Sequence, residues 1–195
     1  MKTETKQKLI EVGAEAVMAK SFDGVGINQV LELAGVPKGS FYHHFKSKEE
    51  FGVAVVNHTA EEHEQRLKDH LLQGDGSPLE RLRAFFEFGR DYHRENGTER
   101  KCLVAKMALD HANLSDPIQS CVKRGFDSWR NVVAQCLEQA KEAGELEEGE
   151  DTVRLADFLN SAWEGVMVRM QVDRDLTVVD SFIELVFERV LVRKG

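Results

Sequence analysis

Residues 34–51, Ala-Gly-Val-Pro-Lys-Gly-Ser-Phe-Tyr-His-His-Phe-Lys-Ser-Lys-Glu-Glu-Phe, decide the fold of this chain, because they have the pattern of a helix-turn-helix. Gly35 is expected to end one helix, since the left-handed conformation just past a helix end costs glycine least. Pro37 suits the first turn of the next helix, where its missing N–H is not needed. The stretch therefore predicts two helices joined by a tight turn.

The second of these helices has one apolar and one polar face. Phe41 and Phe45 are four positions apart, so they share the face that packs inward. The other face carries hydrogen-bond donors and an aromatic ring, and no acid occurs between Glu32 and Glu49. Such a helix suits the major groove of DNA. The alternative is an ordinary polar helix face on an all-α protein. The hydrogen-bond donors on the polar face of the second helix are Lys38, Ser40, Tyr42 and His43.

Composition predicts an all-α protein with a local basic surface. Helix-favouring residues dominate the 195-residue chain, which has three prolines and no long alternation of apolar and polar residues. The net charge is −8, yet acids and bases balance in residues 1–50. Residues 36–48 hold three lysines, two histidines and no acid. An acidic protein can therefore still present a cationic patch to phosphates.

Several protein classes are excluded by the sequence. Because the N-terminus is polar and charged, we expect no signal peptide. No apolar run reaches the ~20 residues of a membrane span, so we expect no transmembrane helix. Three cysteines without a CxxC pair favour a reducing cytoplasm over a disulfide framework. His58 and His63 are five residues apart, which places their rings about 140° apart on a helix and disfavours a shared zinc. We expect neither a metal nor a cofactor.

Helical periodicity and breaks outline about nine helices. Ser47 and Glu50 form a capping box that begins a long helix, and residues 73–78 form the clearest loop. The expected architecture is a three-helix head in residues 1–47 and a larger helical domain in residues 48–195. Besides the short helix after Pro37, the expected helices span about residues 5–20, 27–34, 48–72, 78–95, 102–112, 116–143, 152–172 and 178–192.

The segment Ala34 to Phe45, followed by Ser47-Lys48-Glu49, resembles the signature of TetR-family transcriptional regulators. The resemblance implies that three N-terminal helices read DNA and that a fourth helix (about 48–72) links them to the rest of the chain. It also implies that the remaining domain senses a ligand and dimerises. It implies a homodimer on a palindromic double-stranded operator, with the last two helices at the dimer interface.

The roles of the reading residues follow from their chemistry. Gly39 lets DNA approach the backbone closely, and Lys38 can contact a guanine edge or a phosphate. The hydroxyls of Ser40 and Tyr42 can donate hydrogen bonds to phosphates. His43 can contact a guanine edge or a phosphate. Lys48 stands at a helix N-terminus, which also favours phosphate.

The start of the second helix departs from the family pattern. Members commonly have Ser or Thr at the cap, where this chain has Gly26, which brings no side-chain donor. Asn28 or Gln29 is therefore expected to supply the phosphate contact in place of the cap hydroxyl.

Cys102 is the candidate sensor. It follows Arg100 and Lys101, stands at the start of a helix and precedes Lys106 by one turn, and these positive surroundings favour the reactive thiolate. A small buried hydrophobe is the alternative.

The segment from Cys102 to Lys106, with Asp110 and Asn113-Leu114-Ser115, is similar to a subgroup of TetR repressors that sense oxidants and electrophiles through a thiol. The resemblance implies release from DNA when Cys102 is modified. Cys121 and Cys136 are expected to be packing residues. Most of the large apolar side chains of the second domain are expected in the core, some of them around a ligand cavity: Trp129, Trp163, Phe85, Phe86, Phe88, Phe126 and Met167.

Three other functions compete with this hypothesis. The repressor could respond to a small molecule that binds without a covalent bond. A cysteine enzyme would need a base near Cys102, but His111 is nine residues away and off that helix face. A helical dimerisation module without DNA binding is the third alternative. We therefore predict a non-enzymatic DNA-binding repressor, induced by an electrophile or another small molecule.

Overall fold

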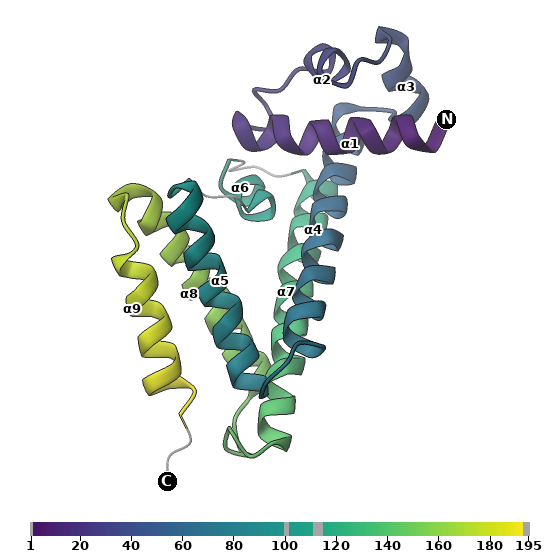
Figure 1. Ribbon diagram of the computed structural model, residues 1–195. Coiled ribbons are helices and arrows are strands. Elements are labelled where there is room, and N and C mark those ends of the chain that lie inside the picture. The colour runs from purple at the N-terminus through teal and green to yellow at the C-terminus, as the bar shows by residue number, and fades with distance from the viewer. Residues whose placement is uncertain (1, 100–101, 111–114, 193–195) are drawn as a thin grey trace. The chain divides into compact units, whose positions relative to one another are not determined.

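A computed structural model describes residues 2–99, 102–110 and 115–192. Within them the chain is helical and has no strand, which confirms the all-α prediction. The α-helices of these described ranges, labelled in Figure 1, are α1 (Lys2–Ala19), α2 (Ile27–Ala34), α3 (Phe41–His44), α4 (Lys48–Leu72), α5 (Pro78–Asn96), α6 (Leu103–Asp110), α7 (Asp116–Glu142), α8 (Thr152–Asp173) and α9 (Thr177–Leu185).

The helix boundaries around the quoted stretch have the predicted chemistry. Gly35 is left-handed with φ 64°, its N–H donates to the Glu32 carbonyl, and the N–H of Val36 donates to the Leu31 carbonyl. At the start of α4 the Glu50 N–H donates to Ser47 Oγ at 3.0 Å. The Glu50 carboxylate accepts from the Lys46 N–H at 2.7 Å, one residue before the cap, so the Ser47 cap is formed but the return bond of the predicted capping box is displaced by one residue.

Two elements differ from the sequence prediction. The segment after Pro37 begins as a 3₁₀ turn over Lys38–Ser40, and only Phe41–His44 is α-helical. At the end of the chain, α9 stops at Leu185 and a π-helical turn covers Val186–Val190. Short 3₁₀ and π turns keep helical side-chain spacing locally, so apolar periodicity cannot distinguish them from α-helix.

The chain packs as two compact units that do not follow chain order. The head unit comprises residues 1–62 and 101–126, and the C-terminal unit comprises residues 63–100 and 127–195. The head unit has eleven Lys or Arg residues and eleven Asp or Glu residues, so the whole net charge of −8 belongs to the C-terminal unit. Division of function at residue 47 stays a prediction, but by packing residues 101–126 belong with the N-terminal helices.

The core of the head unit joins helices that are distant in sequence. Leu9 and Val17 of α1, Phe41 and Phe45 of the reading segment and Phe51 of α4 are buried together. The same cluster includes buried residues of α6 and of the first turns of α7: Leu103, Val104, Met107, Ile118, Cys121 and Val122. The candidate sensor helix therefore shares one hydrophobic core with the reading helices.

The core of the C-terminal unit is aromatic. The ring centroid of Phe86 lies 4.9 Å from that of Trp163 and 5.1 Å from that of Phe182, which ties α5, α8 and α9 together. Trp129 is buried as predicted. The prediction for Phe88 is wrong, because its side chain is 62% exposed on α5. No helix in the described ranges is long and apolar enough to cross a membrane.

Candidate DNA-binding surface and sensor cysteine

The reading segment rests on a cluster of three phenylalanine rings. The centroid of Phe41 lies 5.3 Å from that of Phe45 and 5.4 Å from that of Phe51, and Phe45 lies 5.2 Å from Phe51. Such edge and tilted contacts add to the burial of each ring. A four-residue helix is too short to be stable alone. The cluster is therefore what fixes α3 and its polar face.

The predicted reading residues lie on the surface. Lys38, Gly39, Tyr42 and His43 are exposed, and Ser40 is partly exposed. Tyr42 is 67% exposed, with its ring edge-on to Phe41. A Cβ atom at Gly39 would meet no other heavy atom within 4 Å, so packing does not explain the missing side chain. The open backbone there suits close approach by a polymer such as DNA.

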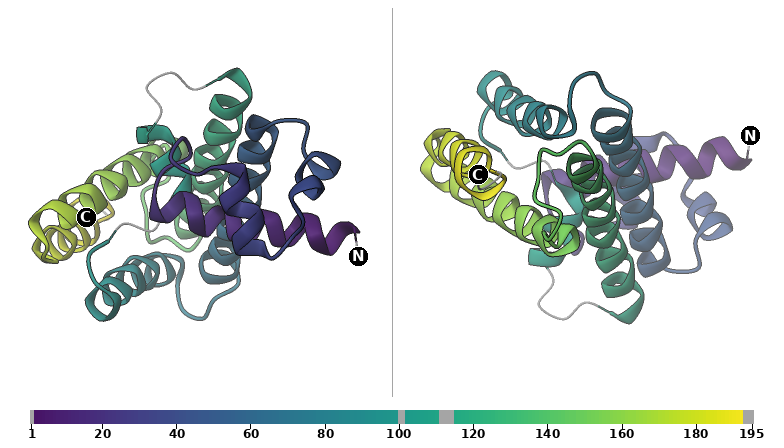
Figure 2. Two further views of the ribbon diagram at one scale, coloured as in Figure 1. Left: turned by 90° about the horizontal axis from the view of Figure 1, so that it is seen from above. Right: turned by 90° about the horizontal axis from the view of Figure 1, so that it is seen from below.

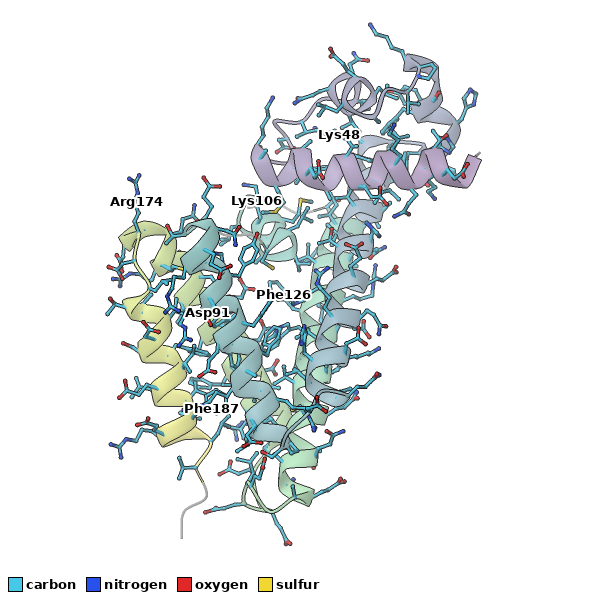
Figure 3. The ribbon with its side chains drawn as sticks, in the orientation of Figure 1. Lys48, Asp91, Lys106, Phe126, Arg174 and Phe187 are labelled. Carbon is cyan, nitrogen blue, oxygen red and sulfur yellow. The ribbon has the colours of Figure 1, made fainter. Side chains whose placement is uncertain are left out.

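Lys48 is held where α4 begins (Figure 3). Its Nζ donates to the carbonyl of Asp23 at 3.2 Å and lies 5.0 Å from the ring centroid of Phe22. The side chain therefore spans from α4 to the loop between α1 and α2. This arrangement fixes one cation beside the reading helices.

The start of α2 has no side-chain cap. Gly26 has extended backbone angles and makes no side-chain hydrogen bond, and a Cβ atom there would meet nothing within 4 Å. Asn28 is exposed, whereas the side-chain oxygen of Gln29 accepts from Lys20 Nζ at 3.1 Å. Sequence reasoning missed Lys20. It follows the end of α1, where no local pattern links it to α2.

Cys102 stands immediately before α6, as predicted. Its side chain is partly buried against the head-unit core, and its carbonyl accepts from the N–H of Lys106 at 3.0 Å. Figure 3 shows Lys106 on α6. The predicted contributions of Arg100 and Lys101 lie outside the described residues, as do His111, Asn113 and Leu114 of the sequence argument. Of the features predicted to favour a thiolate, the helix start with its free N–H groups and Lys106 on the first turn lie within the described residues.

The helix that follows Cys102 is tightly seated. A Cβ atom at Gly125 would lie 3.0 Å from a methyl group of Val104 and 3.6 Å from Cβ of Ala60, so α7 meets both α6 and α4 where glycine leaves room. Residues of α1 also approach α6. An added group at Cys102 would therefore act on a packed junction, because tightly packed interiors shift between discrete arrangements rather than deform smoothly.

The other two cysteines are packing residues, as predicted. Cys121 is buried and its thiol donates to the Ile118 carbonyl at 3.1 Å, while burial raises the pKa of the thiol. Cys136 donates to the Pro78 carbonyl at 3.3 Å, and burial raises its pKa to about 11. Both are therefore protonated and poorly nucleophilic near pH 7.

The two histidines of the metal-like pattern lie in different surroundings. His58 Nε2 lies 3.3 Å from the side-chain nitrogen of Gln7 and 3.5 Å from a carboxylate oxygen of Glu62. His63 belongs to the C-terminal unit. Within the described part of the chain, no group of three His, Cys, Asp or Glu side chains is arranged to hold a metal ion.

Two family models match this chain. Residues 9–55 match a model described as bacterial regulatory proteins of the tetR family. Residues 78–186 match a model described as the tetracyclin repressor-like C-terminal domain. The first match contains the reading helices, and the second covers the C-terminal half from α5 to α9.

Individual relatives match over most of their length. The transcriptional repressor DhaR of Mycobacterium sp. strain GP1 is 29% identical over 97% of this chain and 94% of its own. The transcriptional regulator AcuR of Cereibacter sphaeroides is 32% identical over 86% of this chain and 76% of its own. The transcriptional repressor NemR of Escherichia coli K12 is 29% identical over 91% of this chain and 89% of its own. The crystal structure of reduced E. coli NemR covers 98% of both chains with a TM-score of 0.90 and 26% identity.

Proposed function

This chain belongs to the TetR family of bacterial regulatory proteins and is a transcriptional repressor of that type, and we propose that electrophiles and oxidants release it from DNA through Cys102. One observation carries the proposal: Cys102 packs against the same hydrophobic core that positions the reading helices. A change at this thiol therefore needs no long route to affect DNA binding.

The chemistry expected of Cys102 is addition to an activated double bond. The thiolate sulfur bonds to the β-carbon of a quinone or a maleimide, the electron pair of the double bond moves onto the carbonyl, and water supplies the proton. The product carries new bulk at the start of α6. If the added group costs more free energy in the DNA-bound protein than in the DNA-free protein, the binding free energy for DNA falls by the difference between the two costs. A loss of about 2.7 kcal/mol lowers binding about 100-fold, enough to relieve repression.

The DNA-bound state proposed here is a homodimer. Helix α8 exposes an apolar and small-residue stripe at alternating spacings of three and four, and α9 lies beside α8 (Figure 2). Small residues at the middle of the stripe permit close approach of two helices. The stripe on α8 consists of Phe158, Ser161, Gly165, Val168 and Val172, and Leu185 of α9 is also exposed.

A dimer presents two reading segments to successive major grooves, roughly 34–36 Å apart, on a palindromic site. Tyr42 and Lys48 are assigned to phosphates, together with Ser40 and Asn28. Lys38 and His43 are assigned to base edges or phosphates. Tyr42→Phe and Lys48→Ala should weaken binding to all sequences, and Lys48→Ala should also reduce the slope of log affinity against log salt by about one unit.

The thiol proposal is tested by DNA binding of wild type, Cys102→Ser and Cys136→Ser before and after N-ethylmaleimide or a quinone. The DNA comes from selection of genomic fragments by the reduced wild-type protein. We expect modification to release wild type and Cys136→Ser but not Cys102→Ser. If treated wild type stays bound, or if Cys102→Ser is released equally, thiol sensing is wrong. A non-covalent inducer then becomes the better account.

The same samples separate the remaining alternatives. Turnover of the electrophile beyond one equivalent per thiol would support a cysteine enzyme. Failure of reduced wild-type protein to retain any genomic fragment at low salt would support a dimerisation module without DNA binding.

A further inference from the structure

Two lysine side chains meet the loop between α1 and α2, which also carries the acid Asp23. Lys48 reaches back to the Asp23 carbonyl in this loop, and Lys20 at its beginning reaches forward to Gln29 in the first turn of α2. Both lysines are thus held by neutral oxygen acceptors, a carbonyl and a side-chain amide. Neither of these two hydrogen bonds neutralises the lysine charge.

The bond between Lys20 and Gln29 orders an exposed lysine. Both side chains lie at the surface, and Lys20 Nζ donates to the side-chain oxygen of Gln29 at 3.1 Å. A single hydrogen bond between exposed neutral and charged groups adds little to stability, since it exchanges with water. Its clearer consequence is geometric, because it keeps the ammonium group over the first turn of α2. The remaining ammonium protons of Lys20 can then donate to another acceptor.

The acceptor that this position favours is an anion at the start of α2. The cap residue Gly26 fills no space there, so the backbone N–H groups that begin α2 are not covered by a cap side chain. A positive side chain and the positive end of a helix dipole then point to the same side. In a DNA-reading head, the anion available beside the recognition segment is a backbone phosphate.

We propose that Lys20 contacts a DNA phosphate and that Gln29 acts as its positioning residue. This inference rests on the DNA-binding function proposed above and adds Lys20 to the residues assigned to the interface. It also changes the role of Gln29, which would hold a lysine rather than donate to DNA itself. Sequence-independent phosphate contacts fix the register of a protein on the duplex. Lys20 would therefore help to aim the reading segment rather than specify bases.

The test measures DNA affinity between 50 and 200 mM salt for wild type, Lys20→Ala, Lys20→Arg and Lys68→Ala. Lys68 is the matched control, because it pairs with Glu64 in the C-terminal unit and its loss changes the net charge equally. The probes are a mixed-sequence duplex of about 30 base pairs and a genomic fragment retained by wild type.

Lys20→Ala should reduce the salt slope by about 0.9 for each head bound, which corresponds to about a 3.5-fold change per head over this salt range. Lys20→Arg and Lys68→Ala should keep the wild-type slope. An unchanged slope for Lys20→Ala overturns the inference, even if its melting temperature falls, because the Lys20 bond would then only join α1 to α2. If wild type binds neither probe at low salt, the DNA-binding function itself is wrong.

The positioning role of Gln29 is tested by a double-mutant cycle. Gln29→Leu should weaken binding in the wild-type background and have no further effect in Lys20→Ala. An equal loss in both backgrounds would show that Gln29 contacts DNA independently of Lys20, and would exclude the positioning role.

Discussion

The ring of Phe22, in the loop after α1, packs directly on Gly52 of α4: a Cβ atom at position 52 would lie 2.6 Å from two of its ring carbons. Gly13 of α1 receives the ring of Phe51 in the same way. These reciprocal contacts join α1 to α4. Gly52→Ala should lower the free energy of unfolding by about 1–3 kcal/mol, since an extra methyl group has no space. Urea unfolding followed by circular dichroism measures the change.

Gly149→Ala is the matched control for this substitution. A Cβ atom at Gly149 would meet nothing within 4 Å, and its exposed loop position predicts a change within about 0.5 kcal/mol. Equal stability of wild type and Gly52→Ala would show that the Phe22 ring moves aside without cost, contrary to a close-packed junction.

Local chemistry made much of the head predictable. The left-handed Gly35, the Ser47 cap of α4 and the buried pair Phe41 and Phe45 each depend on residues within five positions. Such signals act over one turn, so the sequence displays them directly.

Contacts between distant segments were not predictable from the sequence. Nothing local indicates that Phe22 packs on Gly52, that Lys20 bonds to Gln29, or that α6 shares the head-unit core. The helical period identifies an apolar face but not the partner that covers it. For the same reason Cys102 was recognised as a reactive candidate, whereas its proximity to the reading helices emerged only from the fold.

The three cysteines should differ strongly in reactivity. Burial raises the pKa of Cys136 to about 11, so near pH 7 only about one thiol in 10⁴ is ionised. Burial also raises the pKa of Cys121. One equivalent of N-ethylmaleimide at pH 7 should therefore label Cys102 first, as read by peptide mass spectrometry. Labelling of Cys136 should increase about tenfold per pH unit below its pKa. Equal labelling of Cys102 and Cys136 in the native protein would contradict this order.

His63 should make stability depend on pH. Burial, with help from the positive charge of Arg66, lowers the pKa of His63 from 6.5 to about 4. Between these values the unfolded chain binds the proton and the folded chain does not. Stability is therefore present above pH 6.5 and falls as the pH drops towards 4, by up to about 3 kcal/mol.

His63→Gln should flatten this dependence between pH 4 and 6.5. His70→Gln, which removes an exposed histidine from the same helix, is the control and should keep the wild-type slope. Urea unfolding at several pH values measures both, and a wild-type slope in His63→Gln would assign the pH dependence to other groups.

Arg174, at the end of α8, is the one residue other than glycine with positive φ among the described residues, at 57° (Figure 3). This conformation costs a side-chain-bearing residue of the order of 1 kcal/mol more than glycine. Arg174→Gly should therefore raise the free energy of unfolding by about 0.5–1 kcal/mol. Arg169→Gly, five residues earlier, should lower it by about 1 kcal/mol, because it places glycine inside the helix and removes an ion pair of 2.8 Å with Asp173. The same sign for both substitutions would contradict this account.

Gly165 offers a direct test of the proposed dimer. It is exposed in the middle of the α8 stripe, and a Cβ atom there would meet nothing within 4 Å in the single chain. An arginine at this position should fold normally as a monomer but block a second copy, because a buried unpaired charge is costly. Sedimentation velocity should show Gly165→Arg as a monomer and Gly149→Arg, with the same new charge on an open loop glycine, as a dimer. A Gly165→Arg protein that stays dimeric would place the interface elsewhere. A monomer that binds a palindromic fragment as tightly as wild type would separate DNA affinity from dimerisation, contrary to the two-groove arrangement.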